Sequence, residues 1–335
     1  MKRSRNFLSL EKELIKRFLM SEAMQSILRS WTLPVGVTVS LAVIIAVYFR
    51  GWLQIRQTRP ELFPVRRPIY FFTGLLALWL ALASPLDTLV ERLLVAHMTQ
   101  HLILMSVAPP LILLGAPVVP LLRGLPRLAI QKFLRPGLSS GTLNRIGRTI
   151  THPIFAWLAM NLAYVAWHIP AAYEFALNSE GWHECEHACF FFTSLLFWFS
   201  VIQPWPAVSR CAPWLMLLYL LAADIVNTAL SFFLTFSGRL LYPSYGAVPR
   251  IASLTPLADQ AAAGAMMWVL GSVAFLLPAA LITIQLLSPQ KAAFQQDRDR
   301  TASSTTSSIR RAQFPVNCNT QARDEWFSRS PDRAR

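Results

Sequence analysis

Two pairs of histidines have the spacing to bind one metal ion. His97 and His101 are four residues apart, and so are His183 and His187. Because an α-helix turns by about 100° per residue, each pair lies on one face of its helix, and Met105 extends the first face by a further turn. Ionisable side chains are costly in hydrocarbon, so histidine pairs inside apolar segments indicate a functional site.

Further polar and sulfur-containing side chains stand near the ends of other apolar segments. His168 comes at the end of one segment, and Asp259 begins the last one, with Met266 two helical turns further on. Under the membrane topology derived below, these ends share one leaflet with the histidine pairs. We therefore expect one histidine-rich site. His152 falls at the opposite end and is interpreted as a loop or helix-start residue.

The donor types favour copper but leave other occupants open. Imidazole, thioether and carboxylate together suit copper, and methionine favours its cuprous state. Haem is an alternative, since histidines on facing helices can supply both axial ligands. A third interpretation has no metal at all, with hydrogen-bonded imidazoles that brace neighbouring helices or carry protons.

The run from His183 to His187 also matches the pattern H-E-x-x-H. In zinc metalloproteases two such histidines bind zinc, and the intervening glutamate, here Glu184, is the general base. A protease needs a third ligand and a substrate cleft, and no second motif in the chain nominates them. The protease interpretation therefore rests on this short match alone.

The composition places the chain in a membrane. Of its 335 residues, 54% are hydrophobic and only 14% are charged, and the mean hydropathy is +0.42. A soluble domain has nearer a quarter of its residues charged. The net charge of +14 lies in loops and tails, where it is better explained by topology and anionic lipid than by nucleic acid. The four cysteines are scattered and define no disulfide framework.

Seven apolar runs are long enough to cross a bilayer, whose hydrocarbon core takes about 20 helical residues. They lie near 33–50, 69–85, 93–115, 153–173, 184–204, 212–236 and 260–287. We predict an all-α, polytopic bundle of seven transmembrane helices over residues 31–290. Residues 1–30 would be a basic amphipathic arm, or the product of a misassigned start, and residues 291–335 a disordered polar tail.

The charges of the short loops predict the orientation. The first and third loops are rich in arginine and lysine, while the loops between them are not: the basic residues are Arg50, Arg56, Arg59, Arg66 and Arg67 in the first loop and Arg123, Arg127, Lys132, Arg135, Arg145 and Arg148 in the third. Basic loops stay in the cytoplasm. This puts the amino terminus outside, the carboxyl terminus inside and the histidines in the outer leaflet.

Five motifs in fixed order resemble a known family. The segments HMTQH…APPLILLG, WHIP..Y, H..EH before an aromatic run, LYPSY, and PLADQ…G.MMW resemble the CtaG-type assembly factors of bacterial cytochrome c oxidase over roughly residues 30–287. The resemblance implies a protein of the bacterial plasma membrane that acts with oxidase subunits, with copper as the supposed cargo. Its polar positions here are His97, Gln100, His101, His168, His183, Glu186, His187, Asp259 and Gln260. Ala261 departs from the pattern, since relatives often carry a second glutamine there.

We therefore predict a non-enzymatic assembly factor that binds or passes copper. The preferred ligands are both histidine pairs, with further candidates in His168, Asp259, Met105 and Met266. Gln100 and Glu186 would orient the ring nitrogens, as hydrogen-bond partners of metal ligands generally do, and Gln260 belongs to the set only through the resemblance. We also expect the Pro109 and Pro110 pair to break or kink the third helix, and Asp224 and Asn227 to brace neighbouring helices.

Overall fold

A computed structural model describes residues 31, 34–61, 63–134, 140–207, 211–248 and 254–288. The chain divides into two compact units, Met1–Ile282 and Thr283–Arg335. The description below concerns the first unit, since only the last residues of one helix are described in the second. The predicted amino-terminal arm at 1–30 and the predicted tail at 291–335 lie outside the described residues.

The described ranges are helical and contain no strand, which confirms the all-α prediction. In chain order the helices are α2 (Val35–Thr58), α3 (Arg66–Ala83), α4 (Pro85–Val90), α5 (Leu94–Leu102), the π-helix η1 (Ile103–Val107), α6 (Ala108–Leu114), α7 (Val118–Gly124), α8 (Arg127–Ala129), the π-helix η2 (Ile130–Leu134), α10 (Gly141–Ile150), α11 (Pro153–Trp167), α12 (Pro170–Leu177), α13 (Glu180–Ile202), α14 (Pro213–Phe236), α15 (Ser244–Ala247) and α16 (Pro256–Leu287).

Five of the described helical segments are long and apolar enough to cross a membrane: Val35–Thr58, Leu94–Leu114, Glu180–Ile202, Pro213–Phe236 and Pro256–Leu287. A sixth is counted if α11 and α12, which are bent by 77° relative to each other, form one broken span. Helix α3 occupies the place of the second predicted span but is not among them. Its 18 residues include Arg66 and Arg67, which shorten the apolar stretch.

The third predicted span runs without a break through α5, η1 and α6. Pro109 has no backbone N–H, so it cannot donate to the carbonyl of Met105 four residues earlier. That carbonyl instead accepts a hydrogen bond from the indole Nε1 of Trp198 on α13, at 2.9 Å. No break occurs at the two prolines, and the π-helical turn η1 lies immediately before them, an irregularity of the kind found within helices.

Close backbone contact holds α2 against α7. A Cβ atom added at Gly51 would overlap the carbonyl of Pro120, and one added at Gly124 would overlap the carbonyl of Val47. Small residues at such crossings let membrane helices pack at short distance. Both helices also contribute side chains to a core cluster built from α2, α3, η1, α6 and α7.

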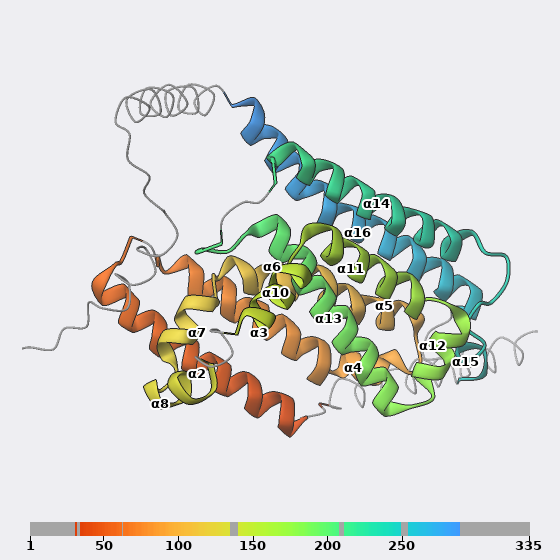
Figure 1. The fold of residues 1–335 in the computed structure, drawn as a ribbon. Coiled ribbons are helices and arrows are strands. Elements are labelled where there is room, and N and C mark those ends of the chain that lie inside the picture. Colours follow the sequence, from red (N-terminus) through yellow and green to blue (C-terminus); the bar gives the residue numbers. More distant parts are fainter. Residues whose placement is uncertain are drawn as a thin grey trace, which may run out of the picture. The chain divides into compact units, whose positions relative to one another are not determined.

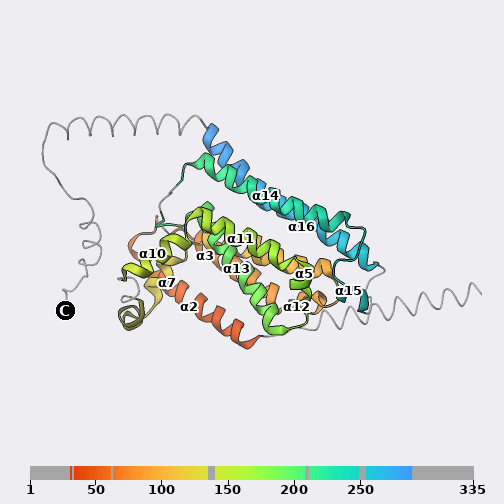
Figure 2. The same ribbon diagram turned by 45° about the vertical axis from the view of Figure 1, so that its right-hand side comes forward.

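A second core cluster packs against the predicted site, where its members Tyr173 and Phe190 contact His97 and His101. It joins buried side chains from α5, η1, α6, α11, α12, α13, α14, α15 and α16. In both ribbon views the short helices α12 and α15 lie close to the first turns of α5, on the opposite side of the bundle from α7 (Figures 1 and 2). The starts of α5, α13 and α16 and the end of α11 are thus brought to one end of the bundle.

Candidate metal centre

The two histidine pairs lie against each other at that end of the bundle. His97 and His101 come from α5 and His183 and His187 from α13, and one ring nitrogen of each lies within 4.8 Å of one ring nitrogen of every other. Each pair shares a helix face because its members are separated by about one turn. The packing of α13 beside α5, η1 and α6 then joins the two faces.

The geometry of the closest pair suits a shared ion. A first-row metal ion binds an imidazole nitrogen at about 2.0–2.1 Å, so two ligands at the tetrahedral angle have nitrogens about 3.3–3.4 Å apart. The Nε2 atoms of His97 and His183 are 3.3 Å apart. All four nitrogens lie within 4.8 Å of one another, a looser spacing than the roughly 3.3–3.4 Å of a tetrahedral site, so the rings would have to draw closer to share one ion.

Two tyrosines fix the orientation of the His97 ring. Its Nδ1 atom lies 2.8 Å from the hydroxyl of Tyr245 and 2.7 Å from that of Tyr173. The Tyr245 hydroxyl donates to the carbonyl of Val90, so its oxygen can accept the proton of Nδ1. Burial raises the pKa of Tyr245 well above its usual value, which keeps this hydroxyl protonated. A proton on Nδ1 leaves the Nε2 lone pair for a metal ion.

Buried polar atoms without partners surround the other histidines. Neither ring nitrogen of His101 and neither carboxylate oxygen of Glu186 has a hydrogen-bond partner among the described residues, and the same is true of Nε2 of His187. Glu186 is 1% exposed, and its Oε1 lies 3.8 Å from Nε2 of His101. Leaving such groups buried and unpaired is costly. A cation among them would be bound by the imidazoles and would offset the carboxylate charge.

His168 lies beside this group on the side of α11. Its ring centroid is 6.4 Å from that of His101. Its Nδ1 is 2.7 Å from the carbonyl of Tyr164, while its Nε2 is buried without a hydrogen-bond partner. The structure therefore brings His168 next to the four histidines and not among them.

Asp259, predicted as a ligand, contacts the start of α5. Its two carboxylate oxygens accept hydrogen bonds from the backbone amides of Leu94 and Val95, at 2.8 and 3.2 Å. The first amides of a helix have no partner within the helix, and the residue before α5 supplies no side-chain cap. A carboxylate from α16 thus caps α5 and complements its dipole one turn before His97.

The two predicted glutamines also contact the backbone. Gln100 donates from Nε2 to the carbonyl of Ala81 and to the carboxylate of Asp87, at 2.8 and 3.3 Å. Gln260 accepts from the amide of Leu241 and donates to the carbonyl of Arg239, at 2.8 and 3.1 Å. Gln100 thus joins α5 to α3 and α4, and Gln260 holds the segment before α15 against α16.

The two methionines predicted as further ligands lie in different surroundings. The Met266 sulfur accepts a hydrogen bond from the hydroxyl of Thr99 at 3.1 Å. Met105 lines a cavity of about 30 Å³ that also borders His101 and His168. This cavity is too small for a porphyrin, so it could not hold the haem of the alternative interpretation.

The remaining polar residues of the sequence analysis have structural contacts. Asp224 accepts from the hydroxyl of Ser272 at 2.7 Å, and Asn227 accepts from Tyr164 at 3.0 Å, so both brace neighbouring helices as predicted. His152 caps α11, accepting from the amide of Ile154.

Glu184, the residue a protease would use as base, is exposed, whereas Glu186 is buried beside His101. The exposed position gives no support to the protease interpretation.

The tyrosines at 173 and 245 received no role in the sequence analysis, although both lie in the quoted motifs WHIP..Y and LYPSY. Their contact with His97 depends on tertiary packing, and nothing in the local sequence indicates it.

The family model for the cytochrome c oxidase caa3 assembly factor (Caa3_CtaG) matches residues 46–288. These residues include α3 to α16 and every histidine of the site. No curated protein and no solved structure matches the chain.

Proposed function

Because the chain belongs to the cytochrome c oxidase caa3 assembly factor family, we propose that it binds copper at His97, His101, His183 and His187 and delivers it during assembly of the oxidase. The observation that carries the proposal is the convergence of four imidazoles from two helices within 4.8 Å. Imidazole also suits zinc, nickel and iron, so the choice of copper rests on the family and not on the geometry.

The surroundings of the histidines support binding that is reversible. Four neutral imidazoles and one nearby carboxylate, Glu186, provide enough donors for a cuprous or a cupric ion. The rings of His97 and His183 are already spaced for a shared ion, whereas the group as a whole spans up to 4.8 Å and would have to contract. The energy needed for that movement keeps binding weaker than at a closed structural site, as release to a partner requires. In this proposal the protein turns over no substrate.

The proposed topology has seven spans. Helix α3 would be the second, and the bent pair α11 and α12 would be the fourth. Lysines and arginines gather in the segments at the end opposite the histidines, and the positive-inside rule places that end in the cytoplasm. The amino terminus would then lie outside the bacterial plasma membrane and the carboxyl terminus inside. The histidine site would face the outer leaflet, where oxidase subunits could accept the ion.

Replacing one central ligand tests the proposal in cells. We expect His101→Ala to insert in the membrane at normal levels but to lower oxidase activity and the copper content of the purified oxidase, with partial recovery when copper is added. His152→Ala is the matched control, since this histidine only caps α11. Normal oxidase activity in the His101→Ala strain would count against copper delivery by this site.

A further inference from the structure

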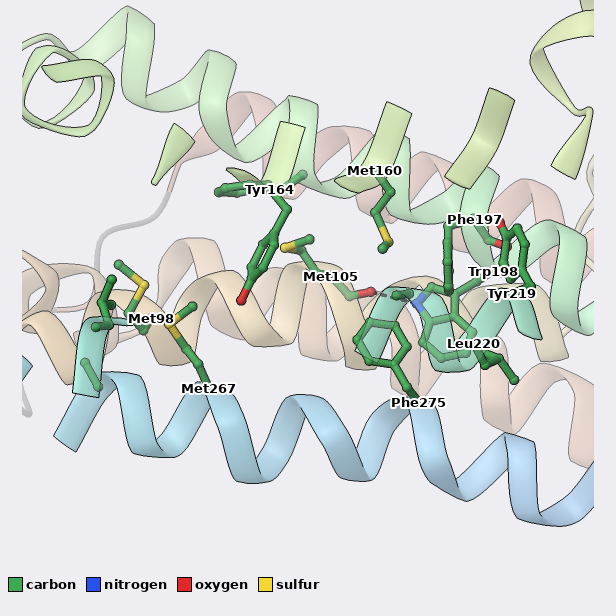
Figure 3. Packing of buried hydrophobic residues seen from close by; sticks show 14 of the residues in the cluster. Met98, Met105, Met160, Tyr164, Phe197, Trp198, Tyr219, Leu220, Met267 and Phe275 are labelled. Atoms are coloured by element: carbon green, nitrogen blue, oxygen red, sulfur yellow. Dashed lines mark hydrogen bonds between the residues drawn. The ribbon is translucent and has the colours of Figure 1, made fainter. Parts of the chain in front are cut away.

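A small cavity next to the four histidines is lined by methionines from three parts of the fold. Met98 and Met105 come from α5 and η1, Met160 from α11 and Met267 from α16. Figure 3 shows these side chains reaching into the region between the helices, with Tyr164 directed into it from α11. Four of the nine methionines in the chain thus line one cavity of about 30 Å³.

Two histidines of the cavity wall carry ring nitrogens without partners. The Nδ1 atom of His168 lies 2.7 Å from the carbonyl of Tyr164, an acceptor, so Nδ1 carries the proton and Nε2 carries the lone pair. That Nε2 atom is buried and has no hydrogen-bond partner among the described residues, and His101 has none at either nitrogen. A backbone carbonyl that fixes the tautomer in this way is typical of histidines that bind metals.

The donors of the cavity select the kind of ion. Thioether sulfur and imidazole are neutral and favour soft ions such as Cu(I). The cavity wall contains no carboxylate, and the cost of burying an ion without a compensating charge rises with the square of its charge. A monovalent ion is therefore favoured over a divalent one. The volume is sufficient for about one or two water-sized occupants.

We propose that this cavity is a second binding site, in which Nε2 of His168 and thioether sulfurs from among Met98, Met105, Met160 and Met267 hold a cuprous ion. His101 belongs to both the cavity wall and the four-histidine group. It is therefore the residue through which an ion would pass from one site to the other. The choice of copper rests on the proposed function, whereas the preference for a soft monovalent ion rests on the cavity.

The π-helical turn places Met105 at this cavity. The span from α5 to α6 contains the π-helix η1, which shifts the register of the residues within it. The Met105 carbonyl is held by Trp198, so the backbone from which its side chain projects is fixed on the α13 side. Such irregular turns are frequent at functional sites, and here the turn lies one helical turn beyond His101.

Anaerobic titration with a cuprous salt tests the second site. Detergent-purified wild-type protein should bind two cuprous ions per chain against a competing chelator, and X-ray absorption at the copper edge should detect sulfur ligands. The variant Met105→Leu/Met160→Leu/Met267→Leu preserves side-chain volume, a change that cores tolerate well. It should bind one ion and lose the sulfur scattering. Met216→Leu, at a buried methionine that does not line the cavity, should behave as the wild type.

The outcomes separate this proposal from copper delivery by the four histidines. If the triple methionine variant retains two ions and sulfur scattering, or if wild-type protein binds a single ion with nitrogen ligands only, the second site does not exist. Alanine at His97 and His183, which do not line the cavity, should remove the imidazole-bound ion and leave the sulfur-bound one. Loss of only the sulfur-bound ion in that variant would overturn both assignments.

Discussion

Asp259 offers a sharp test of how the site is held, because its carboxylate could serve a metal or a helix. In the structure it accepts hydrogen bonds from the amides of Leu94 and Val95 at the start of α5. We therefore expect Asp259→Ala to destabilise the protein without removing a metal ligand. The first turn of α5 would lose its cap, and His97, one turn later, would be held less firmly.

The size of the effect follows from the two amides. A buried donor left without an acceptor costs about 1–3 kcal/mol, so Asp259→Ala should destabilise the fold by about 2–6 kcal/mol. Asp259→Asn keeps one carbonyl oxygen as an acceptor and should recover roughly half of that loss. The order of stability should thus be wild type, Asp259→Asn, Asp259→Ala.

Thermal unfolding in detergent, with and without copper, measures both effects together. The midpoint of the metal-free protein should fall in the order given, while the number of metal ions bound per chain stays unchanged. If Asp259→Asn instead leaves the metal-free midpoint at the wild-type value and binds fewer ions, Asp259 is a ligand. The capping argument would then be refuted.

Four further substitutions test other parts of the account. Tyr245→Phe removes a hydrogen-bond partner of a ligand, so isothermal titration should give metal binding about 10–100-fold weaker with unchanged stoichiometry; unchanged affinity would contradict the role of this hydroxyl. Trp198→Phe leaves the Met105 carbonyl unpaired and should cost about 1–3 kcal/mol in a thermal or chemical unfolding assay, whereas a wild-type midpoint would show that the indole is dispensable. Glu186→Gln should weaken metal binding and Glu184→Gln should not, and the reverse result would favour the protease interpretation.

Helical periodicity made the centre of the site predictable. Residues four apart share a face in any α-helix, so both histidine pairs could be recognised before their packing was known. The charges of the loops also predicted that the end of the segment 153–173, which carries His168, lies in the same leaflet as the two histidine pairs. Periodicity gives no information on which neighbour a face contacts. Asp259 was accordingly expected at a metal, yet its carboxylate reaches the uncapped amides of another helix.

Features that depend on contacts between distant segments could not be predicted. Tyr173 and Tyr245 lie in short connecting helices whose positions are set by tertiary packing, so their contact with His97 has no local signal in the sequence. Pro109 predicted a break or kink, but the hydrogen bond that the Trp198 indole donates to the freed Met105 carbonyl joins residues far apart in the chain and has no local signal in the sequence. The second predicted span was marginal because two arginines begin α3.

The central claim is that four histidines from two helices bind one metal ion, and metal analysis of purified protein tests it most directly. Wild-type protein loaded with copper and desalted should retain an imidazole-bound ion, detected as nitrogen scattering at the copper edge, and His152→Ala should retain it too. The variant with alanine at all four positions should lose that ion: the positions are His97, His101, His183 and His187. Equal copper content and equal nitrogen scattering in the wild type and in the fourfold variant would contradict the claim.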